Sequence, residues 1–111
     1  MKYTLEIPPV VYRDLAQIET YIALDKPSAA KKVVKKITTA IRSLPDNPFT
    51  AAELRKKYGL DTDLRGRIVK PYIIIYDVKG THIKIYRVFD CRSDYLAILG
   101  FAKGLDESDD E

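Results

Sequence analysis

The chain has 111 residues, which suits one domain, and it is 46% hydrophobic and 32% charged. This balance excludes disorder over most of its length, and no apolar run approaches the roughly 18 residues of a membrane span. The N-terminus lacks the hydrophobic region of a secretory leader. The single cysteine, Cys91, excludes an internal disulfide and fits a reducing compartment, so we expect a cytoplasmic protein with no membrane partner.

Charge is distributed unevenly along the chain. It has 19 basic and 16 acidic residues, and five of the acids lie in residues 106–111, which leaves 19 basic and 11 acidic residues, or +8, in residues 1–105. We expect residues 1–105 to form a single domain and residues 106–111 to be a disordered acidic tail. A basic body favours a polyanion or an acidic protein as partner, although the tail alone could simply aid solubility.

The first 24 residues predict a strand followed by a helix. Residues 2–7 alternate polar and apolar side chains, as a half-buried strand does, and a pair of prolines ends the alternation. Residues 9–24 repeat apolar side chains at steps of three and four, the pattern of an amphipathic helix. The polar residues between them, Asp14 included, are expected to face water.

A second amphipathic helix is predicted over residues 28–44, with Ser28 as its N-cap. The short break between the two helices implies an antiparallel helical hairpin. The basic flank of the second helix consists of Lys31, Lys32, Lys35 and Lys36. Such a flank could meet nucleic-acid phosphates, but a charge run on an exposed helix is more often a solvated face.

The C-terminal half predicts three strands after an irregular stretch. Residues 46–63 are the least regular, with a short helix expected over residues 51–58. The strands are predicted at residues 64–70, 72–78 and 82–89, and a short closing segment at residues 92–103. The middle strand is almost continuously apolar, so we expect it to be central and covered on both faces.

The predicted fold class is therefore α+β. It comprises an N-terminal strand, a two-helix antiparallel hairpin and a three-stranded antiparallel meander, with the hairpin packed against a four-stranded, mainly antiparallel sheet.

This order of elements resembles the RelE/ParE superfamily of toxins from type II toxin–antitoxin systems. The resemblance covers residues 3–99, and the motifs that carry it lie at residues 3–7, 12–22, 27–30, 41–45, 71–78 and 83–95. The central strand, PYIIIYDV, and the closing stretch, IKIYRVFDCRSDY, are its most recognisable parts. The superfamily implies a growth-inhibiting toxin that is neutralised by a cognate antitoxin.

Two activities follow from the resemblance, and the residues favour one of them. RelE-like members cleave mRNA on the ribosome without a metal, whereas ParE-like members bind DNA gyrase. Ile73 stands where RelE-like members carry a central arginine, so we favour the ParE-like activity. If the chain is instead a metal-independent endoribonuclease, the candidate catalytic residues are Arg65, Arg67, Arg92 and Tyr95. A degenerate member that only binds its antitoxin is the third alternative.

Other chemistry-bearing residues are weaker candidates. His82 could act as a general base, but it lies beside a predicted hairpin turn and is expected to be exposed. His82 and Cys91 have neither metal-site spacing nor a supporting motif, so we expect no metal and no cofactor. Alternation places Arg87 with apolar neighbours, so we expect a structural ion pair, with Asp77 or Asp94 as its partner.

Overall fold

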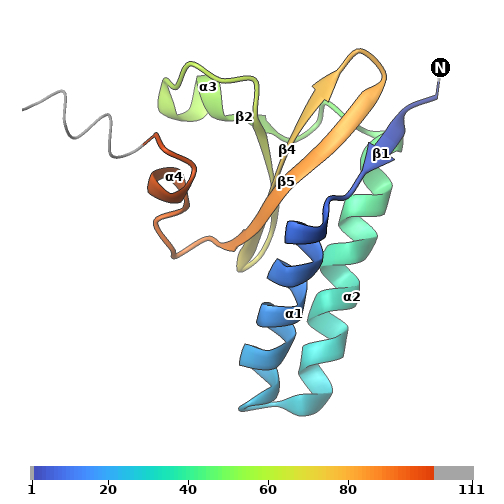
Figure 1. Ribbon diagram of the computed structural model, residues 1–111, viewed down its shortest axis with the longest axis vertical. Helices are drawn as coiled ribbons and strands as arrows, with labels where there is room; N and C mark the ends of the chain where they lie inside the picture. Colours follow the sequence, from blue (N-terminus) through green and yellow to red (C-terminus); the bar gives the residue numbers. More distant parts are fainter. Residues whose placement is uncertain (1, 102–111) are drawn as a thin grey trace, which may run out of the picture.

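The structure is a computed structural model that describes residues 2–101, and it is a five-stranded sheet with helices on both faces (Figure 1). The expected acidic tail, residues 106–111, lies outside the described residues. The strands are β1 (Thr4–Glu6), β2 (Ala52–Glu53), β3 (Arg65–Val69), β4 (Tyr72–Lys79) and β5 (His82–Asp90). The helices are α1 (Pro9–Ala23), α2 (Pro27–Ser43), the 3-10 turn η1 (Leu44–Asp46), α3 (Leu54–Tyr58) and α4 (Tyr95–Ile98).

The predicted strands form one sheet in the order β1-β5-β4-β3-β2. The antiparallel meander of β3, β4 and β5 is confirmed, and β1 joins it by pairing in parallel with β5. The fifth strand, β2, was not predicted, because its two residues are too few for an alternating pattern. β4 is central and buried on both faces, as its apolar sequence predicts.

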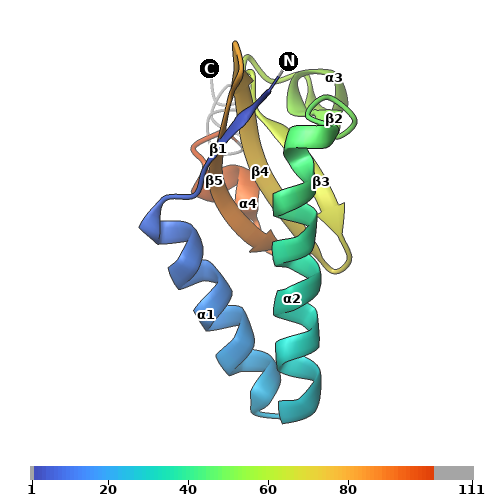
Figure 2. The ribbon, with the colours of Figure 1, turned by 90° about the vertical axis from the view of Figure 1, so that its right-hand side faces the viewer.

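The helical hairpin covers one face of the sheet, and it extends beyond the sheet at its far end (Figure 1). In Figure 2, α1 lies along the β5 side and α2 along the β3 side. The apolar faces of both helices pack on β4 and β5 in one buried cluster. α2 begins at Pro27, not at Ser28, because proline fits the first helical position, where no N–H is needed. Ser28 therefore does not cap this helix.

The opposite face of the sheet is also covered. α3 and α4 lie there, on the other side of the sheet from the helical hairpin (Figure 1). They close a second apolar cluster whose buried members are Leu54, Leu60, Ile73, Ile75, Phe89 and Tyr95. No helix of the described part is long and apolar enough to cross a membrane.

A β-bulge in β5 changes which face its later residues occupy. Tyr76 pairs with Ile85 but Ile75 pairs with Arg87, so Tyr86 is an extra residue in β5. Ile85 and Val88 consequently both belong to the hairpin-side cluster, although they are three residues apart. Simple alternation would place Arg87 beside Ile85, and that prediction is wrong.

Candidate functional site

Ile73 occupies the position where the resemblance would place a catalytic arginine. It is 2% exposed and lies in the apolar cluster beneath α3 and α4. A Cβ atom placed on Gly66 of the neighbouring strand would lie 2.7 Å from Ile73 Cδ1, so the isoleucine fills the space above that glycine. This face of the sheet is a packed core at the point where an RNA-cleaving site would need cations.

Arg65 lies on the other face of the sheet, the face of the helical hairpin. Its Nη1 donates to the carbonyl oxygens of Phe49 and Ala51 at 3.2 and 3.0 Å. Its guanidinium lies 5.0 Å from the centre of the Phe49 ring and 3.6 Å from the Glu53 carboxylate. Arg65 therefore holds the segment that leads into β2, and these contacts occupy most of its donors.

Arg67 shares the hairpin face with Arg65, because side chains two residues apart on a strand point the same way. It lines a hollow between α2 and β3. Within residues 2–101 it has no ion-pair partner, so its charge is available to a ligand.

Arg92 lies in the turn between β5 and α4 and is paired with Asp90. Its Nε and Nη2 donate to the two Asp90 carboxylate oxygens at 2.9 and 2.6 Å, and its backbone N–H also donates to Asp90 Oδ1. The side-chain hydrogen bonds lower the pKa of Asp90 below its usual value and raise the pKa of Arg92. Arg92 is exposed, but a ligand would have to compete with this bidentate pair.

Tyr95 is buried on the α3–α4 side. Its hydroxyl lies 2.8 Å from the Tyr58 hydroxyl, and its ring stacks on Phe89 at a centroid distance of 6.0 Å. Burial raises the pKa of Tyr95, and the hydrogen bond with Tyr58 raises it further. A phenol in this state is a poor proton acceptor at neutral pH.

The four candidate catalytic residues thus lie in three places. Arg65 and Arg67 are on the hairpin face, Tyr95 is on the opposite face, and Arg92 is in the turn after β5. Their participation in catalysis stays a prediction of the ribonuclease alternative.

His82 of β5 contacts two side chains of β1 at the exposed edge of the sheet. Its Nε2 lies 2.7 Å from Glu6 Oε1 and its Nδ1 lies 3.0 Å from Thr4 Oγ1. It is exposed beside the β4–β5 turn, as predicted, and no group of three His, Cys, Asp or Glu side chains suited to a metal occurs in residues 2–101.

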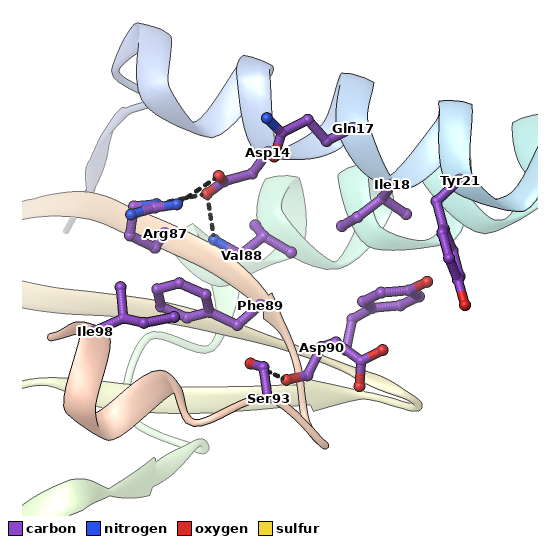
Figure 3. Close-up of a pocket in the computed structure, with 11 residues that line it drawn as sticks. Asp14, Gln17, Ile18, Tyr21, Arg87, Val88, Phe89, Asp90, Ser93 and Ile98 are labelled. Atoms are coloured by element: carbon purple, nitrogen blue, oxygen red, sulfur yellow. Dashed lines mark hydrogen bonds and ion pairs between the residues drawn. The ribbon is translucent and has the colours of Figure 1, made fainter. Parts of the chain in front are cut away.

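A groove lies between α1, the end of β5 and α4. β1 pairs with β5 only as far as Lys84, so the later part of β5 faces α1 instead of a strand. There Asp14 accepts hydrogen bonds from Arg87 Nε, Arg87 Nη2 and the backbone N–H of Val88, each at 2.9 Å (Figure 3). The Asp14 carboxylate therefore accepts the backbone hydrogen bond that a carbonyl oxygen of a neighbouring strand would otherwise accept.

Two predictions that concern Asp14 are wrong. It was expected to face water but is 6% exposed, and it is the partner of Arg87 in place of Asp77 or Asp94. The expectation that Arg87 forms a structural ion pair is confirmed. A signal existed in the sequence: Asp14 is flanked on α1 by Val11, Leu15 and Ile18, so it borders the apolar stripe.

The groove beside this pair is mostly apolar. Its volume is about 370 Å³, and Ile18, Tyr21, Phe89 and Ile98 line it (Figure 3). Tyr72 also contributes to the lining. Tyr21 is 68% exposed and Ile98 is 57% exposed, although both are large apolar side chains. The charged groups of the groove are already paired, Asp14 with Arg87 and Asp90 with Arg92. Such a surface suits an apolar side chain of a protein partner better than a phosphate.

Solved structures define the class to which this fold belongs. The chromosomal ParDE toxin–antitoxin system from P. aeruginosa matches with a TM-score of 0.67 at 20% identity, over 80% of this chain and 96% of that chain. A mutant of the E. coli toxin RelE in the free state matches with a TM-score of 0.60 at 13% identity, over 88% and 93% of the two chains. The toxin–antitoxin complex RelBE2 from Mycobacterium tuberculosis matches with a TM-score of 0.56 at 20% identity, over 81% and 99%. The fold is that of the RelE/ParE toxin superfamily.

A family model narrows the assignment. The model described as the ParE toxin of the type II toxin–antitoxin system parDE matches residues 5–95. The chain therefore belongs to the ParE toxin family of type II toxin–antitoxin systems. No curated protein sequence matches it significantly.

Proposed function

We propose that this chain is a toxin that arrests growth by binding DNA gyrase and is neutralised by a cognate antitoxin. The observation that carries the proposal is the buried Ile73 within a sheet face that α3 and α4 close with apolar side chains. A toxin that lacks a catalytic site has to act by binding a macromolecule. The apolar groove beside α1 suits contact with a protein surface.

Ribonuclease chemistry has less support from these side chains. Cleavage through the 2′-hydroxyl needs a proton acceptor, a proton donor and cations around one phosphate. Arg65 is held by main-chain carbonyls, and Tyr95 has a raised pKa on the opposite face of the sheet. These placements favour binding over catalysis.

Two observations support an antitoxin as partner: the positive charge of this chain and the similar solved structures. Two of the similar structures are those of the ParDE toxin–antitoxin system and of the RelBE2 toxin–antitoxin complex. The body of this chain, residues 1–105, carries a formal charge of +8, which an acidic protein would complement.

The test combines an assay in cells with one on the purified protein. The chain is induced without the protein encoded by the adjacent reading frame, and mRNA 5′ ends are mapped soon afterwards. In parallel, DNA supercoiling by purified gyrase is measured with the chain added. Growth arrest with intact mRNA and loss of supercoiling are the expected results.

Two other results would overturn the proposal. New cuts inside translated frames, absent for Arg92→Ala but present for the exposed control Arg42→Ala, would make the chain a ribosome-dependent endoribonuclease. No arrest by folded protein that still binds its neighbour would identify a degenerate member that only binds antitoxin.

A further inference from the structure

A groove lies between α2 and β3 on the hairpin face of the sheet (Figure 2). Its volume is about 480 Å³, and one of its walls is formed by residues 67–70. The α2 side chains of the opposite wall are Lys36, Thr39, Ala40 and Ser43. The groove and the buried Ile73 lie on opposite faces of the sheet, so this surface is separate from the apolar cluster beneath α3 and α4.

The charged side chains of this groove are all basic. They are Lys36, Arg67 and Lys70, and within residues 2–101 none of the three forms an ion pair. Lys36 and Lys70 are exposed, and Arg67 is half-buried. By contrast, Arg65, Arg87 and Arg92 are each paired with a carboxylate. The groove therefore offers three uncompensated positive charges to a ligand.

The positive charge continues beyond the groove along α2. Lys32 is exposed and precedes Lys36 by four residues, so it lies one helical turn further along the same face. Neither α2 nor β3 contains an acidic residue. A row of cations without intervening acids attracts a polyanion, whose own charges repeat along a line.

The uncharged residues of the groove narrow the kind of polyanion. Among the described residues, no aromatic side chain lines it, so no ring is present to stack on an unpaired base. Proteins that bind single-stranded nucleic acids generally use such rings. Thr39 is exposed, and its hydroxyl can donate to a phosphate oxygen. These features suit the sugar–phosphate backbone of a duplex, whose bases are paired with each other.

We propose that this groove binds the phosphate backbone of duplex DNA through Lys36, Arg67 and Lys70. The toxin thereby contacts the DNA on which gyrase acts, in addition to the enzyme itself. These contacts are independent of base sequence, because phosphates carry no sequence information. The inference rests on the proposed function, because gyrase is the target that brings duplex DNA to this chain.

Titration of a fluorescent DNA duplex of mixed sequence with the purified chain tests the groove directly. Three phosphate contacts predict that the logarithm of the association constant falls with the logarithm of salt concentration with a slope of about −3. Lys36→Gln combined with Lys70→Gln is expected to weaken binding roughly tenfold at low salt and to change the slope to about −1. The two single variants, each expected to change the slope by about 1, replace the double variant if it does not fold.

A matched control separates the groove from general charge. Lys31→Gln combined with Lys35→Gln removes the same charge from exposed positions of α2 that lie outside the groove. This control is expected to weaken DNA binding less than about threefold, because its side chains do not line the groove. Thermal unfolding establishes that each variant folds.

A second measurement tests the contact within the gyrase complex. The affinity of the chain for purified gyrase is measured without DNA and with duplex DNA bound to the enzyme. DNA is expected to tighten the binding of the unaltered chain roughly tenfold, because phosphates add contacts in the groove. The variant with Lys36→Gln and Lys70→Gln should lose most of this gain, whereas the control variant should keep it.

The outcomes separate this inference from the proposed function. Equal DNA affinity and equal salt dependence of the groove variant and the unaltered chain overturn the groove assignment, and inhibition of supercoiling would then still support gyrase as target. Tighter binding of single-stranded DNA or of duplex RNA than of duplex DNA also overturns the inference. DNA binding that depends on the groove, without any effect on supercoiling, retains the DNA site and overturns the proposed target.

Discussion

Asp14 of α1 and Arg87 of β5 lie 73 residues apart in the chain and are joined by two hydrogen bonds of 2.9 Å. The same carboxylate accepts the backbone N–H of Val88, which no strand reaches. The buried Asp14 carboxylate therefore holds α1 against β5, and it accepts a hydrogen bond from the edge of β5 that has no neighbouring strand. Arg87 in turn lies 4.8 Å from the centre of the Phe89 ring, so the pair also connects to the apolar cluster of the other face.

Replacing Asp14 is expected to destabilise the fold strongly. Asp14→Ala leaves the Val88 N–H and the half-buried Arg87 without an acceptor, which costs about 3 kcal/mol of unfolding free energy. Asp14→Asn keeps one acceptor oxygen and should cost about half as much. Urea denaturation measures both.

A surface ion pair provides the control for this prediction. Glu19 and Lys31 lie 3.6 Å apart and are exposed, so Glu19→Gln should change stability by less than about 0.5 kcal/mol. Equal effects of Asp14→Ala and Glu19→Gln would show that the buried pair has no special role.

Gly66→Ala is expected to destabilise the protein by about 1–2 kcal/mol, because the new Cβ meets Ile73 Cδ1 at 2.7 Å inside a packed cluster. Ile73→Val removes that atom, so Gly66→Ala should cost less in the Ile73→Val background. A double-mutant cycle by chemical denaturation should give a coupling energy of about 1 kcal/mol between the two sites. Additive effects would argue against this contact.

The pair formed by Tyr58 and Tyr95 predicts behaviour at high pH. The folded protein holds the Tyr95 proton more tightly than the unfolded chain, so this stabilisation is present below the usual tyrosine pKa of about 10 and is lost as pH rises above it. Tyr58→Phe removes one cause of the raised pKa and should lower it. Carbon NMR of the tyrosine rings measures the change, and an unchanged titration of Tyr95 would contradict the prediction.

The pair formed by Asp90 and Arg92 predicts behaviour in acid. The pKa of Asp90 is lowered in the folded state, so its stabilisation is present above the usual carboxyl pKa of 3.8 and is lost as pH falls below that value toward the folded-state pKa. Arg92→Gln should raise the pKa of Asp90 toward its usual value. NMR titration of the carboxyl carbon tests this, with Arg42→Gln as a matched exposed control.

Much of the fold could be predicted, because the apolar spacing of each element is a local property of the chain. Steps of three and four predict α1 and α2, and the continuous apolar run of residues 72–78 predicts a central strand. β2 could not be predicted, because two residues are too few to show an alternating pattern and because the strand forms only by pairing with β3.

The candidate sites were less predictable, since they depend on which residues meet. The sequence by itself determined the order of elements, the central strand and the surplus of basic residues in the body. Only the tertiary structure decided that Arg87 meets Asp14, because α1 lies beside the part of β5 that β1 does not reach, an arrangement that arises from packing between distant segments. It also decided that Arg67 and Lys36 share a groove, since the end of β2 and the path of α2 arise from packing between distant segments.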